Sequence, residues 1–144
     1  MVEAVGERWW PAYLDCIARN LALGGKAALQ FISIDHRLFD AYASSADFIQ
    51  TYIFPGGMLL NEPRFQALGE DRGLVFSNRD GFGLDYAETL RIWCSQYDLA
   101  VRDGRLAGFD DSFHKLWRYY LMYCEGGFRG GGIDVAQVTL TITE

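Results

Sequence analysis

The most constraining stretch of this sequence is residues 110–142, in which a helical pattern gives way to a strand pattern. Apolar residues first recur every three or four positions, so they share one face of a helix. These residues are Phe113, Leu116, Trp117, Tyr120, Leu121, Cys124 and Phe128. Asp110, Asp111 or Ser112 can cap the start of this helix, and the pair Gly126–Gly127 is typical of a helix end.

A strand is predicted after the glycine run 130–132. Apolar and polar side chains alternate along it, as they do where one face of a strand is buried. The alternating residues are Val138, Thr139, Leu140, Thr141, Ile142 and Thr143. Because no helix follows the glycines, they predict a turn or hinge and not a phosphate-binding loop.

Tyr120 lies on the apolar face of the predicted helix, whereas its neighbour Tyr119 points elsewhere. A phenol that points into a protein interior needs a hydrogen-bond partner. Spacing alone leaves two interpretations open. Tyr120 is either a core tyrosine bonded to a backbone carbonyl or a member of a functional site.

The first part of the chain predicts a helix from Glu7, ended by Gly24–Gly25, and then a strand over Lys26–Ile34. That strand is apolar through most of its length, which predicts burial on both faces as in a parallel sheet. A helix followed by a buried strand is typical of half an open α/β sheet. Asp85 and Glu88 form a capping-box pattern that opens another helix.

The segment 35–72 contains many aromatic residues and the glycine-proline turn 55–57. Such a segment predicts a lid or the wall of an apolar pocket. A second patch of ordinary core is an equally good interpretation of the same residues. Leu74–Phe76 follows as a brief strand. The element order therefore predicts an α/β fold in a single domain, residues 1–144, with 35–72 as an insertion.

Charge and composition exclude some classes of partner. The net charge is −6 and no cationic run is present, so nucleic acid is not expected as a partner. An anionic membrane is repelled on average, although a local patch can still make peripheral contact. No apolar run approaches the length of a membrane span, and no signal peptide opens the sequence. We therefore expect a cytoplasmic protein, with peripheral membrane contact as an open alternative.

The metal-ligating residue types are sparse. The three cysteines are odd in number and widely spaced in helical patterns, which predicts buried thiols in a reducing compartment. His36 and His114 have no further ligands at metal-binding spacing except Asp35, which adjoins His36, so no metal site is expected. The candidates for chemistry are instead polar residues within apolar stretches: Glu3, Gln30 and Tyr120. Each costs free energy if it is buried without a partner, about 1–3 kcal/mol for a neutral group.

Several segments resemble the family of cyclopropane-fatty-acyl-phospholipid synthases and mycolic acid cyclopropane synthases. The motifs occur in the family's order and spacing, and they cover essentially all 144 residues. What they match is the family's C-terminal part. The matching segments are Met1–Gly6, Phe48–Leu59, Tyr86–Leu90 and Trp117–Arg129.

The resemblance implies the C-terminal half of a class I methyltransferase sheet, Rossmann-like, with an aromatic lid. It implies S-adenosylmethionine as methyl donor and the cis double bond of an unsaturated acyl lipid as acceptor. A bound bicarbonate then takes a proton, and either a cyclopropane or a methyl branch results. By resemblance, Glu3 and Tyr120 hold the bicarbonate, and Ile32 contributes through its backbone.

Gln30 departs from the family pattern, since it stands where the best-known cyclopropane synthases have histidine. Glutamine can donate a hydrogen bond to an anion but cannot take up a proton near neutral pH. Simple methylation or another acyl substrate therefore becomes more plausible than ring closure. The residues expected to contact the acyl chain are Phe48, Tyr52, Phe54, Gly56, Gly57 and Met58.

The donor-binding motif of such folds would lie upstream of Met1, so no residue of this chain is assigned to S-adenosylmethionine. We therefore expect a shortened chain that binds the donor poorly on its own. The strand Lys26–Ile34 would then present an open apolar edge. A non-catalytic lipid-binding remnant or pseudoenzyme fragment is the alternative function.

Overall fold

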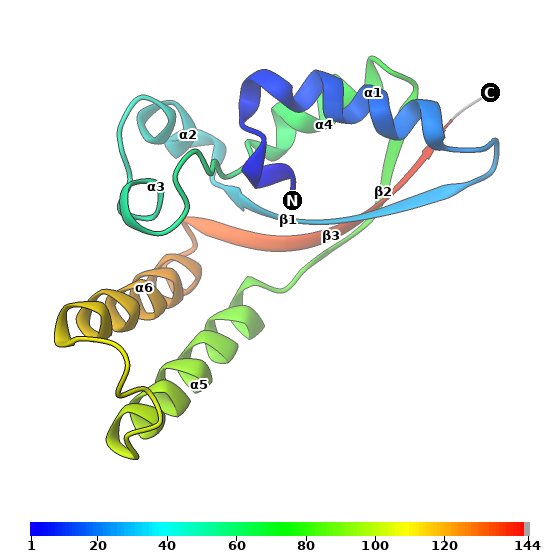
Figure 1. Ribbon diagram of the computed structural model, residues 1–144. Helices are drawn as coiled ribbons and strands as arrows, with labels where there is room; N and C mark the ends of the chain where they lie inside the picture. The colour runs from blue at the N-terminus through cyan, green and yellow to red at the C-terminus, as the bar shows by residue number, and fades with distance from the viewer. Residues whose placement is uncertain (143–144) are drawn as a thin grey trace. The chain divides into compact units, whose positions relative to one another are not determined.

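The computed structural model describes residues 1–142 and divides into two compact units (Figure 1). The sheet unit comprises Met1–Gly81 and Ile133–Glu144, and the helical hairpin comprises Phe82–Gly132. Thr143, which the predicted final strand included, lies outside the described residues.

The sheet has three strands in the order β1-β3-β2, with β1 at Lys26–Ile34, β2 at Leu74–Gly81 and β3 at Ile133–Ile142. β3 is antiparallel to both neighbours. The predicted bounds of β1 are confirmed, but the prediction of a parallel strand buried on both faces is wrong. Alternate residues of β1 are exposed: Lys26, Ala28 and Gln30. Small alanines tolerate either face, so they concealed this alternation in the sequence.

Helices α1 (Trp10–Asn20) and α4 (Glu62–Glu70) lie on the same face of the sheet (Figure 1). Two short 3-10 helices, η1 (Val2–Ala4) and η2 (Glu7–Trp9), precede α1. The core between helices and sheet is strongly aromatic, and each member is almost fully buried. Its largest side chains are Trp10, Phe31, Phe39, Phe65, Leu14, Leu60, Leu74 and Leu140. The Trp10 ring meets the Phe65 ring edge-on, with centroids 5.7 Å apart.

The aromatic segment 35–72 combines both interpretations offered above. It contains α2 (His36–Ala43), α3 (Phe48–Tyr52) and α4. Phe39 and Phe65 belong to the core, whereas Tyr52 and Phe54 are 64% and 56% exposed. Part of the segment therefore builds ordinary core, and the part around α3 presents rings to the surface.

The helical hairpin consists of α5 (Gly83–Arg102) and α6 (Asp111–Arg129). The predicted Asp110 cap of α6 is confirmed, because its carboxylate accepts a hydrogen bond from the Phe113 N–H at 2.8 Å. The predicted helix end at Gly126–Gly127 is wrong, since α6 continues to Arg129. Phe128 is buried against Tyr86 of α5, with ring centroids 5.2 Å apart, and this packing carries the helix past the glycines.

Two further expectations need correction. The N-cap of α5 is Phe82, without a side-chain hydrogen bond, so Asp85 and Glu88 do not form a capping box. Cys16 is exposed because it lies off the apolar face of α1, and Cys94 and Cys124 are only partly buried. All three cysteines are free thiols. Within residues 1–142, no helix has the length and apolar character needed to cross a bilayer.

Candidate functional site

Glu3 lies at the carboxyl end of β1, where η1 places it. Val2 is 1% exposed and anchors η1 in the core, so the side chain of Glu3 turns toward the edge of the sheet. The Glu3 Oε1 atom accepts a hydrogen bond from the Ile32 backbone N–H at 2.7 Å, and its Oε2 atom lies 2.8 Å from the Met1 amino group. Two residues predicted for the site, Glu3 and Ile32, are therefore in direct contact.

The backbone around Ile32 explains why a carboxylate fits at this point. The N–H of Ile32 points away from β3, so the sheet itself supplies no acceptor for it. On the same side, Leu60 forms a parallel bridge with Ser33, donating its N–H to Ile32 and accepting the N–H of Ile34. The Glu3 carbonyl in turn accepts the Met58 N–H at 2.7 Å. η1, β1 and the segment 58–60 are thus held together by backbone hydrogen bonds.

The charge of Glu3 affects the pKa of Tyr13 on α1. Burial raises the pKa of the Tyr13 phenol, and the nearby carboxylate of Glu3 raises it further. The phenol is therefore protonated at neutral pH. The position of Tyr13 on an amphipathic helix did not predict this effect of Glu3, because the two residues come near each other only in the folded unit.

Gln30 does not occupy a buried position. Its side chain is exposed on the face of the sheet opposite the helices, and its Oε1 atom accepts a hydrogen bond from Gln137 Nε2 at 2.9 Å. Gln30 and Gln137 are direct cross-strand partners in the β1–β3 register. The amide is therefore tied to β3, and no hydrogen bond joins it to Glu3 within residues 1–142.

Tyr120 belongs to the helical hairpin. It is half-buried on α6, and its ring lies 5.1 Å from the ring of Trp117. Burial raises the pKa of Tyr120 to about 12, while neighbouring Tyr119 is 53% exposed. The inward and outward orientations expected for these two tyrosines are thus observed. Whether Tyr120 joins Glu3 in one site stays a prediction, because the two residues belong to separate units.

A hydrogen-bond network fixes the segment that carries the expected acyl contacts. Gln50 of α3 donates from Nε2 to the Gly57 carbonyl at 2.9 Å and to the Tyr42 hydroxyl at 3.3 Å. The Tyr42 hydroxyl also accepts the Leu59 N–H at 3.0 Å. Gly56 has a φ of 83°, which the turn requires and glycine adopts without strain. Tyr42 and Gln50 therefore hold α3 and the turn in one conformation.

Three aromatic rings lie near this network, of which Phe48 and Tyr52 form a pair and Phe54 is an exposed neighbour. Phe48 and Tyr52 lie one helical turn apart on α3, with ring centroids at 5.6 Å. Phe54 is exposed at the start of the turn, while Met58 packs against the core. These residues were expected from the family resemblance, whereas Tyr42 and Gln50 were not among the expected site residues, because their role depends on the tertiary fold.

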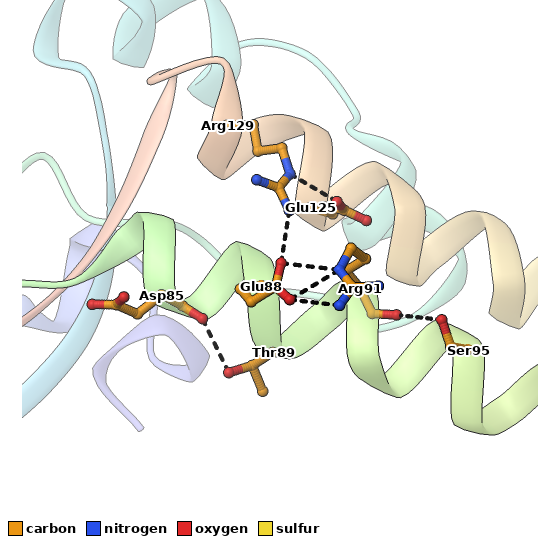
Figure 2. A network of polar contacts seen from close by, with 7 residues as sticks. All are labelled: Asp85, Glu88, Thr89, Arg91, Ser95, Glu125 and Arg129. Atoms are coloured by element: carbon orange, nitrogen blue, oxygen red, sulfur yellow. Dashed lines mark hydrogen bonds and ion pairs between the residues drawn. The ribbon is translucent and has the colours of Figure 1, made fainter.

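A second polar network lies within the helical hairpin (Figure 2). Glu88 of α5 accepts hydrogen bonds from Arg91 on the same helix and lies 3.3 Å from Arg129 Nη2 on α6. Arg129 also contacts Glu125 at 2.8 Å. These alternating charges join the two helices. Within residues 1–142, no three side chains of the metal-ligating types are grouped so as to hold a metal.

Comparison with solved structures defines the class of the fold. The chain superposes on mycolic acid cyclopropane synthase CmaA1, complexed with SAH and CTAB, with a TM-score of 0.85 and 27% identity. The match covers 96% of this chain and 52% of that one. The cyclopropane synthase MmaA2 from Mycobacterium tuberculosis gives a TM-score of 0.83 at 23% identity, with the same coverage, and so supports the fold alone. The fold is that of S-adenosylmethionine-dependent methyltransferases.

The sequence comparisons identify the family. Residues 1–138 match the model of the mycolic acid cyclopropane synthetase family, and the chain belongs to this family. It is 41% identical over 145 residues to tuberculostearic acid methyltransferase UfaA1 of Mycobacterium tuberculosis, covering 97% of this chain and 33% of that protein. It is 29% identical over 141 residues to cyclopropane-fatty-acyl-phospholipid synthase of Escherichia coli, covering 98% and 35%. The chain thus spans about a third of the length of these relatives.

Proposed function

We propose that this chain supplies the acyl-binding and base-holding part of an S-adenosylmethionine-dependent C-methyltransferase that acts on unsaturated fatty-acyl chains of lipids. Family membership supports the reaction class. The observation that carries the proposal is the Glu3 carboxylate, which Ile32 fixes beside the segment leading to Met58. An oriented carboxylate next to aromatic and apolar groups suits a reaction that develops a cation on an apolar substrate.

The chemistry places clear demands on these residues. When the double bond attacks the sulfonium methyl of the donor, a new carbon–carbon bond forms, the sulfur keeps the electron pair of the broken bond, and the acyl chain becomes a carbocation. Aromatic faces stabilise a cation by up to about 2 kcal/mol in a dry site. Phe48, Tyr52 and Phe54 are the rings that we assign to this environment, and a bound acyl chain would have to cover Tyr52 and Phe54, which are exposed without it. Loss of a proton from the acyl chain then closes a ring or leaves a double bond.

A small base is needed for that proton, and bicarbonate supplies it when bound. The residues fit such an anion in their donor and acceptor types. The Glu3 carboxylate can accept from its hydroxyl, and the phenol of Tyr120, protonated at neutral pH, can donate to it. Since the Ile32 N–H is directed at Glu3 in this structure, its part is to orient the carboxylate. Tyr120 and Glu3 are the residues that we propose touch the base.

A methyl-branched product is favoured over a cyclopropane. Gln30 cannot take up a proton near neutral pH, and its amide oxygen is already bonded to Gln137. The relative at 41% identity is named as a methyltransferase of tuberculostearic acid, whereas the one at 29% is named as a cyclopropane synthase. Both points support methylation without ring closure as the outcome for this chain.

A second candidate is lipid binding without methyl transfer. The exposed rings of Tyr52 and Phe54 favour it, because aromatic side chains at a surface suit contact with the interface of a membrane. Peripheral membrane contact is compatible with either function. The two candidates differ in whether Glu3 and Tyr120 affect turnover.

A chimera tests the proposal. Residues 1–144 replace the corresponding third of the 41%-identical relative, and transfer of labelled methyl from S-adenosylmethionine to an oleoyl phospholipid is measured. We expect Glu3→Gln and Tyr120→Phe to lower turnover at least about a hundredfold with donor binding unchanged. Tyr119→Phe is the matched control and should leave turnover intact. Full turnover in both site variants would refute the base-holding role.

A separate titration tests the expectation that residues 1–144 alone bind the donor poorly. Calorimetry with S-adenosylmethionine should show no micromolar binding. Micromolar affinity would contradict the assignment of the donor site to another part of the protein.

A further inference from the structure

The segment 58–60 is bonded to both residues that contact each other in the candidate site. The Met58 N–H donates to the Glu3 carbonyl at 2.7 Å. The Leu60 N–H donates to the Ile32 carbonyl at 3.1 Å, and the Ile32 N–H in turn donates to the Glu3 carboxylate at 2.7 Å. A displacement of this segment would therefore move both the backbone of η1 and the N–H that holds the carboxylate.

The middle residue of the segment is held by a different element. The Leu59 N–H donates to the hydroxyl of Tyr42 on α2 at 3.0 Å. This contact is partly buried, and a buried N–H without an acceptor destabilises the conformation that leaves it unpaired. Leu60 is fully buried and fixes the end of the segment that leads into α4. Tyr42 fixes the preceding part, where Met58 meets Glu3.

The Tyr42 hydroxyl is itself held in place as a neutral acceptor. Its ring packs against the core, 6.4 Å from the ring of the fully buried Phe39 on the same helix. Burial raises the pKa of the Tyr42 phenol, the hydrogen bond from Leu59 lowers it, and the nearby Asp47 carboxylate raises it again, so that the pKa lies above its ordinary value. The hydroxyl is therefore protonated at neutral pH.

Gln50 of α3 fixes the same hydroxyl. Its Oε1 atom accepts the Asp47 N–H at 3.1 Å, as part of the capping box that starts α3. Because this N–H needs an oxygen acceptor, the bond identifies Nε2 as the atom that faces the other way. Nε2 donates to Tyr42 at 3.3 Å and to the Gly57 carbonyl at 2.9 Å. The phenol thus joins α3 to the segment 58–60.

We propose that Tyr42 is a positioning residue for methyl transfer, which keeps the Glu3 carboxylate in place through the segment 58–60. The inference rests on the proposed function, because the position of Glu3 matters only if Glu3 touches the base. Tyr42 acts without touching the reacting atoms. Its phenol holds Leu59, and the neighbouring Met58 holds the backbone of η1. A misplacement of about 1 Å in a reacting site can lower turnover about a hundredfold.

Kinetics of the same chimera test this role. Tyr42→Phe keeps the ring and removes the acceptor of the Leu59 N–H. We expect kcat to fall about tenfold, with the KM for the lipid and the binding of S-adenosylmethionine unchanged. Tyr119→Phe makes the same chemical change at an exposed tyrosine and should leave kcat unchanged. An unchanged kcat in Tyr42→Phe overturns the inference. A higher KM at unchanged kcat also overturns it, because Tyr42 would then act on the acyl contacts.

A double-mutant cycle separates positioning from a general loss of stability. If Tyr42 acts through Glu3, Tyr42→Phe should lower turnover no further once Glu3→Gln has removed the carboxylate. Independent losses that multiply in the double variant overturn the inference and leave the proposed function intact. Full turnover of Glu3→Gln alone refutes the proposed function, and the inference with it. The two failures are therefore distinguishable.

Amide hydrogen exchange on residues 1–144 tests the structural link without turnover. In Tyr42→Phe, exchange of the Leu59 N–H should speed up at least about tenfold, and the N–H groups of Met58 and Ile32 should also exchange faster. The Phe65 N–H inside α4 serves as the internal reference. Faster exchange confined to Leu59 overturns the inference, because the displacement would then not reach the carboxylate.

A second variant decides the case in which Tyr42→Phe does not fold. Gln50→Leu removes the side-chain donor to the Tyr42 hydroxyl and leaves the phenol in place. We expect kcat of the chimera to fall about threefold, because the hydroxyl loses one of the two hydrogen bonds that it accepts. An unchanged kcat in this variant overturns the inference.

Discussion

Gly69 lies inside α4 where the helix crosses β2, and adding one methyl group there should destabilise the sheet unit. A Cβ atom at this position would lie 2.4 Å from Cε2 and 2.9 Å from Cζ of Phe76. Carbon atoms pack at about 3.5–4.0 Å, so the ring would have to move by about 1 Å. Phe76 is partly buried and meets the ring of Phe65 edge-on at 6.1 Å, and Phe65 is 0% exposed, so the Phe76 ring has little room to retreat toward the core.

The magnitude follows from two opposing terms. Overpacking a core costs about 1–3 kcal/mol, and alanine gains up to about 1 kcal/mol over glycine inside a helix. Because the contact is far below normal packing distance, we place the cost in the upper half of its range. Gly69→Ala should thus lower the free energy of unfolding by about 1–2 kcal/mol. Gly126→Ala is the matched control, because a Cβ atom at this position would meet nothing within 4 Å. This substitution should stabilise α6 by about 0.5–1 kcal/mol.

The assay is native-state hydrogen exchange, because it reports each unit separately. Amides of β2 and β3 give the stability of the sheet unit, and amides of α6 give that of the helical hairpin. The double variant Gly69→Ala with Phe76→Leu should recover part of the loss, because the shorter side chain leaves room for the methyl group. A Gly69→Ala protein whose sheet amides are as protected as those of the wild type would refute the close packing of α4 on β2.

Three further outcomes follow from the polar groups. Hydrogen bonds from Arg91 lower the pKa of Glu88. The contribution of Glu88 to hairpin stability is therefore fully present above the ordinary carboxylate pKa, and it is lost as the pH falls through the lowered pKa of the folded state. Glu88→Gln should weaken this acid dependence in thermal melts. Burial raises the pKa of Tyr120 to about 12, so hairpin stability should fall as the pH rises from about 10 toward 12. Tyr120→Phe should abolish that fall, whereas Tyr119→Phe should leave it unchanged. Gln50→Leu removes the bond to the Gly57 carbonyl, and exchange of the Gly57 N–H should speed up about tenfold; an unchanged rate would show that the turn holds itself.

The sequence predicted elements well where local patterns and packing agree. The bounds of β1 follow from its apolar run between glycines and Asp35, and Asp110 caps α6 as its position indicates. Predictions failed where tertiary contacts override local preference. Gly126–Gly127 continues the helix because Phe128 is buried beyond it, and Glu88 binds arginines instead of capping α5.

The candidate site was accessible from sequence only through family resemblance. Nothing in the spacing of Glu3 and Ile32 indicates that they meet, since the contact depends on η1 lying at the edge of β1. The antiparallel sheet was missed for a related reason. Relative strand direction is set by the insertion of β3 between β1 and β2. The residues of β1 alone do not predict which strand will pair with it.

The central place of β3 has a consequence for biosynthesis. β1 and β2 each pair with β3, and the two do not pair with each other in the described chain. Among the described residues, β1 and β2 find their ladder partner only when residues 133–142 have left the ribosome, so the β3 side of β1 stays unpaired through the synthesis of about a hundred residues. Chaperones that bind extended apolar segments should engage Lys26–Ile34 of the nascent chain during that interval.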